Sequence, residues 1–490
     1  MHTPFLPAWR ALLAPLGRRT ATAAAQVRAL TLCRLENAFG GWLPADLFPK
    51  AAGAANSRDR HYTAKRTFWC ALWQAFNPQT SGREVVRQLQ ALFWLEGGPT
   101  ISAEDGAYCR ARERLPLEQF AKALAGSARS ADQLGRRPEG LCGRPVKVVD
   151  GSALTLLADT PKNRAAYPVI QCRPGQPGFP MLRLVVLFSL VSGAILAAAQ
   201  GSLGVSELAL LSQLAGHLAK EDILLGDRGF GSFPVIAFLQ QTRGVDFIGR
   251  TTRRLDGRRR QRRLGHNDWL VEWKKGGNPS PWLTGDQWQA LPDTMRVRVV
   301  KGSLAKKGFR VRQVAVVTTL LDAEHYPAAE ILAACGRRWR LEMCLDDLKT
   351  TLGMAALRSR SPEMVQKELY QHLIAHNFIR CTIAQAATAH NVPSERLSFK
   401  GCLDACRHFA HALAQTKTGK KRRRLWADLL HILATDQIPE RPGRREPRAV
   451  KRAKNKYPRL NQPRRQFKDH PKRHARRTRA RLLKLTPSLK

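Results

Sequence analysis

Three acidic residues in this sequence stand where they could bind a divalent cation together. Asp150 follows the apolar run 145–149, and Asp227 comes just after the apolar run 222–225. A carboxylate just past the end of a buried strand lies exposed at the edge of a sheet, so two on neighbouring strands can share a cation. Glu342, on a later helix, could complete the set. Three carboxylates supply the hard oxygen ligands that Mg²⁺ or Mn²⁺ prefers, and they leave positions for water and phosphate oxygens.

Basic residues accompany Glu342 at helical spacing. Arg338, Glu342, Asp346 and Lys349 follow one another as i, i+4, i+8 and i+11, which predicts one shared helix face. An apolar stripe runs beside that face: Leu341, Leu345 and Leu348. Alone, this pattern is more often a solvated helix, and each aspartate alone is more often a turn or cap residue. Together they favour catalysis, because two metals about 3.5–4 Å apart clamp the attacking and leaving oxygens of a phosphodiester displacement.

The elements that must position these residues alternate between strands and helices. Apolar runs predict strands, and amphipathic spacing predicts helices. The expected order is a strand at 145–149, a hairpin at 182–190 and 194–199, a helix at 206–218, a strand at 222–225, a helix at 233–241 and a strand at 245–248. This order indicates a mixed α/β sheet in which two strands each end in an aspartate.

The segment 250–320 breaks this alternation. It opens with arginines between Arg253 and Arg263, contains four tryptophans and closes with alternating strands at 295–300 and 309–319. It is therefore expected to be a β-rich insertion in the sheet domain. Indoles in a sheet are more often core, which is the default interpretation of its four tryptophans: Trp269, Trp273, Trp282 and Trp288. Helices are expected to return at 328–352, 362–389 and 399–414.

The N-terminal part is expected to be helical. Residues 1–55 are rich in Ala and Arg, and three helices follow at 65–76, 85–93 and 102–115. The last of these places Arg110 and Arg114 on one face. A compact three-helix unit with a basic last helix suits DNA docking, but such units are also common without that role, so both interpretations stay open.

The charge of the chain points to a polyanionic partner. Lys and Arg number 82 against 38 Asp and Glu, a net charge of +44. Residues 441–490 hold 20 basic and 2 acidic residues, so the body, at +26, is basic as well. Nucleic acid is the default partner of a protein with such a strong positive charge, and an anionic membrane is the weaker alternative. The chain beyond about Gly419 is expected to be disordered without nucleic acid.

The cysteines and the longest uncharged run bear on the cellular location of the protein. Ten scattered cysteines without a secretory signal predict reduced thiols in a cytoplasmic protein. Cys402 and Cys406 are one helical turn apart in an Ala/Leu-rich segment, which favours core over a zinc site. The uncharged run 184–200 is too short for a membrane span and is broken by Ser192-Gly193, so no membrane association is expected.

At the acidic residues the sequence resembles the DDE transposases of bacterial insertion sequences, in particular the insertion sequence 4 family, over roughly residues 60–415. The resemblance lies in three blocks: Val149–Ser152, Gly226–Phe230 and Trp339–Lys349. The third block of the family has Tyr, two residues, Arg, three residues, Glu, six residues and Lys. Arg338, Glu342 and Lys349 match it, but Cys335 occupies the position of the tyrosine that helps to hold DNA.

The resemblance implies an α/β fold in which a ribonuclease-H-like mixed sheet with flanking helices is interrupted by the β-rich insertion. The implied domains are a helical DNA-binding region at 1–140, a catalytic domain at 141–415 with the insertion at about 250–320, and a basic C-terminal tail at 416–490. The aspartates are 77 positions apart, and Glu342 follows Asp227 by 115 positions, a gap that accommodates the insertion.

The resemblance also implies cut-and-paste transposition, in which hydrolysis frees a 3′-hydroxyl at the end of the element and that hydroxyl attacks target DNA. The implied ligands of two Mg²⁺ or Mn²⁺ ions are Asp150, Asp227 and Glu342. The implied DNA-binding residues are Arg338, Lys349 and Arg228. The resemblance also makes the four tryptophans of the insertion candidates for stacking on a flipped base. The implied partners are element ends, target DNA and a second copy of the chain, in the bacterial cytoplasm at the nucleoid. A structure-selective nuclease on the same fold and a decayed, non-catalytic DNA-binding protein are the alternatives.

Overall fold

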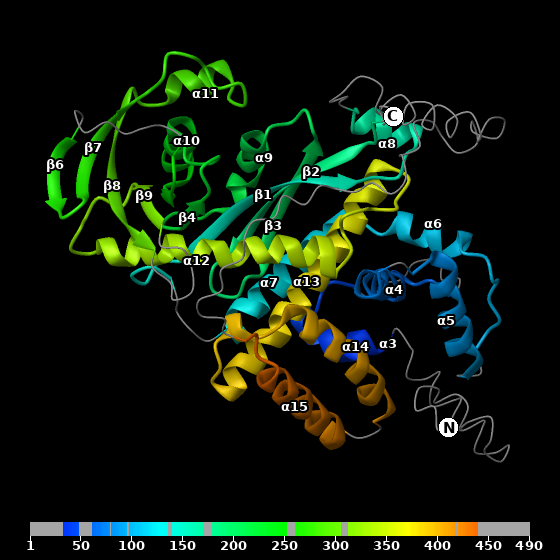
Figure 1. Ribbon diagram of the computed structural model, residues 1–490. Coiled ribbons are helices and arrows are strands. Elements are labelled where there is room, and N and C mark those ends of the chain that lie inside the picture. The colour runs from blue at the N-terminus through cyan, green and yellow to red at the C-terminus, as the bar shows by residue number, and fades with distance from the viewer. Residues whose placement is uncertain are drawn as a thin grey trace, which may run out of the picture.

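A mixed sheet with helices on both faces forms the centre of the computed structural model (Figure 1). The structure describes residues 33–48, 61–78, 80–95, 98–135, 140–169, 178–251, 260–304, 312–416 and 419–439. Within these residues the sheet has nine strands in the order β3-β2-β1-β4-β5-β9-β8-β7-β6. Their bounds are β1 Val146–Leu156, β2 Met181–Ser189, β3 Ile195–Ser202, β4 Ile223–Gly226, β5 Asp246–Gly249, β6 Arg260–Gly265, β7 Asp268–Lys274, β8 Thr294–Leu304 and β9 Arg312–Thr318. The predicted α/β class is confirmed.

The first five strands contain the expected parallel core and hairpin. β1 is parallel to β4, β4 is parallel to β5, and β2 and β3 pair as an antiparallel hairpin beside β1. One prediction was wrong: β1 does not end at Val149 but continues to Leu156. Its second half stays extended because it pairs with β2, through Asp150↔Val186 to Leu156↔Met181, after its pairing with β4 has stopped at Val148. Asp150 therefore lies inside a strand.

The β-rich segment extends the same sheet. β9 pairs antiparallel with β5, through Ile248↔Thr318, and β8, β7 and β6 follow outward in antiparallel order. The expected strands at 295–300 and 309–319 are confirmed, while residues 252–259, with Arg253 and Arg254, lie outside the described part of the chain. A short helix, α11 (Gly285–Ala290), covers the far end, where a capping box at Thr284 starts it.

Helices cover each face of the first half of the sheet. α12 (Ala328–Asp346), α13 (Pro362–His390) and α14 (Phe399–Gln415) occur where the sequence predicts them. α12 and α13 pack on the face that holds Val146, Val148, Ile223 and Leu225. The opposite face is covered by α9 (Glu207–Leu214) and α10 (Phe233–Arg243), and a further short helix, α8 (Pro161–Ala166), follows β1. Among the described helices none is long and apolar enough to cross a membrane.

The N-terminal helices share the core of the sheet. α4 (Ala64–Phe76), α5 (Gly82–Leu95) and α6 (Gly106–Arg114) confirm the three predicted helices, although the last begins four residues later than expected. α3 (Cys33–Phe39) precedes them and α7 (Leu117–Leu134) follows them; residues 1–32 lie outside the described chain. Side chains of α4 and α7 pack in one cluster with α13 and β1, while α5 and α6 close a smaller cluster around Leu89 and Tyr108.

The prediction of a tail without structure from Gly419 onward was wrong for residues 419–435. These residues form the helix α15, whose apolar residues pack against α13 and α14. The apolar positions recur at helical spacing and fill the core: Leu429, Leu430 and Leu433. Residues 440–490, the most basic part of the predicted tail, lie outside the described residues.

Candidate active site

The register of the sheet brings the segments that carry Asp150 and Asp227 to the same part of the fold. β1 and β4 are parallel and pair Val146 with Ile223 and Val148 with Leu225, an offset of 77 positions. Asp150 and Asp227 are separated by the same 77 positions. Asp150 lies in β1 two residues beyond the last pair, and Asp227 follows β4 directly, two residues beyond the same pair.

Both aspartates lie on the face of the sheet that α12 covers. Side chains alternate between faces along a strand. Val146 and Val148 belong to the cluster beneath α12 and α13, whereas Val149 belongs to the opposite cluster. Asp150 therefore shares the face of Val148, and Asp227 shares that of Leu225 by the same alternation. Burial raises the pKa of the Cys344 thiol on α12, Arg380 opposes that rise, and the carboxylates of Asp347 and, to a smaller extent, Asp150 add to it.

Backbone donors orient each carboxylate. The amide of Gly151 donates to Asp150 Oδ1 at 2.9 Å, and the amides of Gly229 and Phe230 donate to Asp227 Oδ1 at 2.8 and 3.3 Å. The loop after Asp227 also passes close to the chain beyond β5. A Cβ atom at Gly231 would lie 1.8 Å from the Arg250 carbonyl oxygen, so only glycine allows this approach. This close backbone approach holds the loop after β4 against the chain that follows β5.

Position 342 lies on the helix face that turns toward the sheet. α12 packs against β1, β4 and β5, and its buried residues recur at spacings of three, four and seven: Ile331, Ala334, Cys335, Arg338 and Leu345. Position 342 is four residues after Arg338 and three before Leu345, so it continues this row. The side chain of Glu342 lies outside what the structure describes. The helix itself crosses the sheet in front of β1 and β4 (Figure 1).

The basic residues expected beside Glu342 have different environments. Arg338 is buried, with 7% of its surface exposed, whereas Asp346 is exposed. Eight residues rotate an α-helix by about 80° beyond two full turns, so these two positions do not share one face as the spacing suggested. Lys349 is half-buried in a π-helical turn, Asp347–Thr351, that ends the helix. Arg228 is exposed in the loop after β4.

An arginine of α13 supports the end of α12, and sequence reasoning missed it. Arg380 Nη2 donates to Cys344 Sγ at 2.9 Å and to Asp347 Oδ2 at 3.4 Å, and its guanidinium lies 5.3 Å from the centre of the Phe399 ring. Burial raises the pKa of Asp347 to about 6, against the opposing effect of Arg380. The one available signal was a charged residue inside the most apolar stretch of α13, which does not identify its partner.

The donor set fits a hard divalent cation. Two half-buried carboxylates, one in β1 and one directly after the neighbouring β4, offer oxygen ligands of the kind that Mg²⁺ and Mn²⁺ take. Among the residues whose side chains the structure describes, no three His, Cys, Asp or Glu gather into a metal-binding group. That set does not include Glu342, the third expected ligand.

The tryptophans of the insertion divide into two pairs. Trp269 and Trp273 are buried in the cluster beneath α10, which agrees with a core role. Trp282 is half-buried, with its ring edge-on to Phe238 at 5.5 Å, and Lys275 Nζ lies 5.0 Å from the centre of the half-buried Trp288 ring. Of the four candidates for base stacking, the second pair is the more accessible.

Cys335 is part of the core. Its surface is 5% exposed, and it packs in the cluster between α12 and the sheet. Burial raises the pKa of its thiol, while the nearby Arg338 and Arg250 act in the opposite direction. A tyrosine at this position would need space that the cluster does not have in the present packing.

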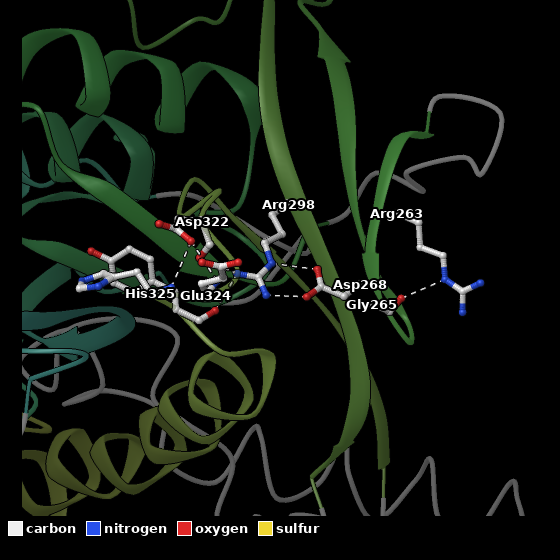
Figure 2. A network of polar contacts seen from close by, with 8 residues as sticks. Arg263, Gly265, Asp268, Arg298, Asp322, Glu324 and His325 are labelled. Carbon is white, nitrogen blue, oxygen red and sulfur yellow. Dashed lines mark hydrogen bonds and ion pairs between the residues drawn. The ribbon is translucent and has the colours of Figure 1, made fainter.

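A buried ion pair connects the insertion to the start of α12 (Figure 2). Arg298 of β8 is fully buried, and its Nε donates to Asp268 Oδ1 of β7 at 2.8 Å. Its Nη1 donates to the carbonyl oxygens of Tyr326 and Asp322 at 2.7 and 3.2 Å. Tyr326 lies two residues before α12, so this arginine fixes the loop that leads into the helix carrying Glu342.

Comparisons with known proteins agree with this geometry. Residues 143–378, which include all three acidic residues, match the family described as the transposase DDE domain. The chain is 26% identical over 427 residues to the transposase InsG for insertion sequence element IS4 of Escherichia coli (strain K12), which covers 86% of this chain and 93% of that protein. A cryo-EM structure of a piggyBac transposase synaptic complex with hairpin DNA matches with a TM-score of 0.37 and 10% identity, covering 84% of this chain and 85% of that one, a similarity too low to support an argument. Residues 143–378 thus match the transposase DDE domain family, and the chain as a whole is similar to the transposase of an insertion sequence 4 element.

Proposed function

We propose that this transposase cleaves DNA at the ends of an insertion sequence and transfers the freed strand to target DNA, with Asp150, Asp227 and Glu342 as the metal ligands. The observation that supports the proposal is the shared offset of 77 positions, by which Asp150 of β1 and Asp227 directly after β4 each lie two residues beyond the last pair of these parallel strands. Half-buried carboxylates supply the hard oxygen ligands that a divalent cation such as Mg²⁺ prefers.

We further propose that the catalytic domain is ribonuclease-H-like. The order β3-β2-β1-β4-β5, with an antiparallel hairpin beside three parallel strands, supports this assignment. The β-rich insertion would enter between β5 and α12, and in the sheet it continues from β5 through β9. We retain the proposed division into a DNA-binding region at 1–140, a catalytic domain at 141–415 and a basic C-terminal segment at 416–490, which includes α15.

The proposed chemistry is hydrolysis followed by transesterification. DDE transposases generally use divalent metal ions, and two Mg²⁺ or Mn²⁺ ions would act here as Lewis acids on the attacking and leaving oxygens. Water attacks the phosphodiester at the element end, and the 3′-oxygen leaves and takes up a proton. This 3′-hydroxyl then attacks a target phosphodiester, and the target's own 3′-oxygen leaves. Asp150, Asp227 and Glu342 hold the ions, while Arg338, Lys349 and Arg228 bind phosphate oxygens.

The partners follow from this chemistry. Element ends and target DNA are the proposed substrates, and the charge of +44 suits both. Because both ends of an element must be cut together, we propose that a homodimer assembles on the DNA, in the cytoplasm at the nucleoid.

The test uses DNA that carries the inverted repeats bracketing the gene. The protein is incubated with Mg²⁺, labelled end-containing DNA and a supercoiled target, and joined products are resolved on gels. Transposition predicts cleavage at the repeat end and labelled strand joined to the target. Cleavage without joining would favour the structure-selective nuclease. Binding without cleavage in either Mg²⁺ or Mn²⁺ would favour the decayed DNA-binding protein.

A further inference from the structure

The helix α15 has two halves with opposite environments. Five consecutive basic residues, Lys420 to Arg424, open the helix, and all five are exposed. The second half is anchored: Leu429, Leu430 and Leu433 are buried in the main core. Trp426 Nε1 donates to Gln385 Oε1 of α13 at 3.0 Å, and the Trp426 ring lies 6.1 Å from that of Trp42, edge to face. The protein thus holds this helix firmly at one end.

The basic end presents its side chains to solvent around the helix axis. Consecutive residues of an α-helix are about 100° apart, so five in a row point in all directions around the axis. All five are exposed, so cationic side chains are accessible to a partner at this end of the helix. In Figure 1, α15 lies at the edge of the molecule away from the insertion.

The charge arrangement is unfavourable for the chain alone. The first turn of α15 contains no acidic residue, and its positive side chains lie at the helix end that is itself the positive end of the dipole. Residues three and four apart on a helix are neighbours, so the pairs from Lys420 to Arg423 and to Arg424 repel each other. A bound polyanion would remove both penalties, and burial of the leucines explains how the helix persists without one.

We propose that residues 420–424 form a second DNA-binding surface, separate from the carboxylate site, that grips the phosphates of duplex DNA irrespective of sequence. The identity of the polyanion rests on the proposed function, because that function brings duplex DNA to the protein. Charge complementarity supports this occupant, since duplex DNA presents about one charge per 1.7 Å of its axis to a compact group of five cations. A membrane is a poorer fit, because an interfacial helix must expose an apolar face and that of α15 is buried in the protein.

The test compares two full-length variants with equal reduction of charge. In the first, Lys420, Lys421, Arg422, Arg423 and Arg424 are all changed to Gln. In the matched control, the same change is made at five basic residues of the C-terminal segment: Arg473, Arg476, Arg477, Arg479 and Arg481. Binding of a random duplex and of an end-containing duplex is measured between 50 and 300 mM salt, and thermal unfolding is followed in parallel.

The proposal predicts that the α15 variant lowers the log–log salt slope by about 3–4, since each phosphate that is no longer neutralised reduces the slope by about 0.9. The reduction should be the same on both duplexes. The unfolding temperature should stay the same or rise, because like-charge repulsion is relieved. A third variant that exchanges Lys and Arg among the five positions should keep the wild-type slope. An unchanged slope in the Gln variant would overturn the proposal, and so would a variant that binds both duplexes as the wild type does but binds anionic vesicles more weakly.

These readouts are independent of catalysis. If the wild-type protein failed to cleave end-containing DNA, the proposed function would fail, while the salt slopes would still decide whether α15 binds duplex DNA. If cleavage occurs, the Gln variant should cleave at near wild-type rate at low salt and saturating protein, because the carboxylate site is unchanged.

Discussion

Removing Asp268 tests whether the buried pair with Arg298 holds the insertion to the catalytic helix. Asp268→Ala leaves a guanidinium inside the protein with only two backbone carbonyls as partners. Breaking a buried ion pair by removing one partner typically costs about 3–5 kcal/mol. Since the two carbonyl bonds remain, the lower part of this range, about 3 kcal/mol, is expected. The double variant Asp268→Leu with Arg298→Met removes the unpaired charge and should recover most of this stability.

The assay is urea unfolding of both variants beside an exposed control. Arg263 is exposed and donates to the carbonyl of Gly265 at 3.1 Å, and Arg263→Ala should change stability by about 0.5 kcal/mol or less. The double variant recovers stability but not the bonds to the loop before α12, so its cleavage rate should stay below that of the wild type. Equal stability of Asp268→Ala and Arg263→Ala would refute the reasoning. A double variant that cleaves at full rate would refute the link to α12.

Three further substitutions probe the site and its supports. Cys335→Tyr should lower stability by about 1–3 kcal/mol without faster cleavage, because it overpacks the core; a stable and faster variant would show that this position faces DNA. Burial raises the pKa of Asp347 to about 6 from 3.8, so the folded protein binds this proton more tightly than the unfolded chain does. The stability that the proton contributes is lost as pH rises through that range. Asp347→Asn should therefore gain about 2 kcal/mol over wild type between pH 4 and pH 7 in urea unfolding, and a shrinking difference would contradict this. Gly231→Ala should lower both stability and cleavage, since its Cβ would meet the Arg250 carbonyl; wild-type values in both assays would exclude the close approach.

Local sequence patterns predicted much of the fold. The hairpin at β2 and β3, the strands β4 and β5, and the long helices α12 and α13 occur where apolar periodicity places them. The separation of Asp150 and Asp227 was visible in the sequence, but its meaning was not. Only the observed parallel register, with the same offset, turns that separation into adjacency.

Features that depend on distant partners could not be predicted. β1 continues past Asp150 because β2 pairs with it, and α15 forms because its leucines find a core built by α13 and α14. The pairs Arg298–Asp268 and Arg380–Asp347 join residues 30 and 33 positions apart, and nothing in the local sequence selects those partners. Charge alone made residues 419–435 look unstructured, since the basic run hides the apolar spacing that follows it.

The most direct test of the central claim is a change of metal preference at the proposed ligands. A thiolate is a poor ligand for Mg²⁺ but an acceptable one for Mn²⁺, so a cysteine in a true ligand position makes cleavage depend on Mn²⁺. Asp150→Cys and Asp227→Cys are assayed for cleavage of end-containing DNA in each metal, beside the corresponding Asn variants and Glu342→Gln. We predict no cleavage by any of them in Mg²⁺, recovery in Mn²⁺ by the two cysteine variants only, and DNA binding close to wild type throughout. Cleavage in Mg²⁺ at near wild-type rate by either cysteine variant, or by Glu342→Gln, would contradict the assignment of that residue to the metal site.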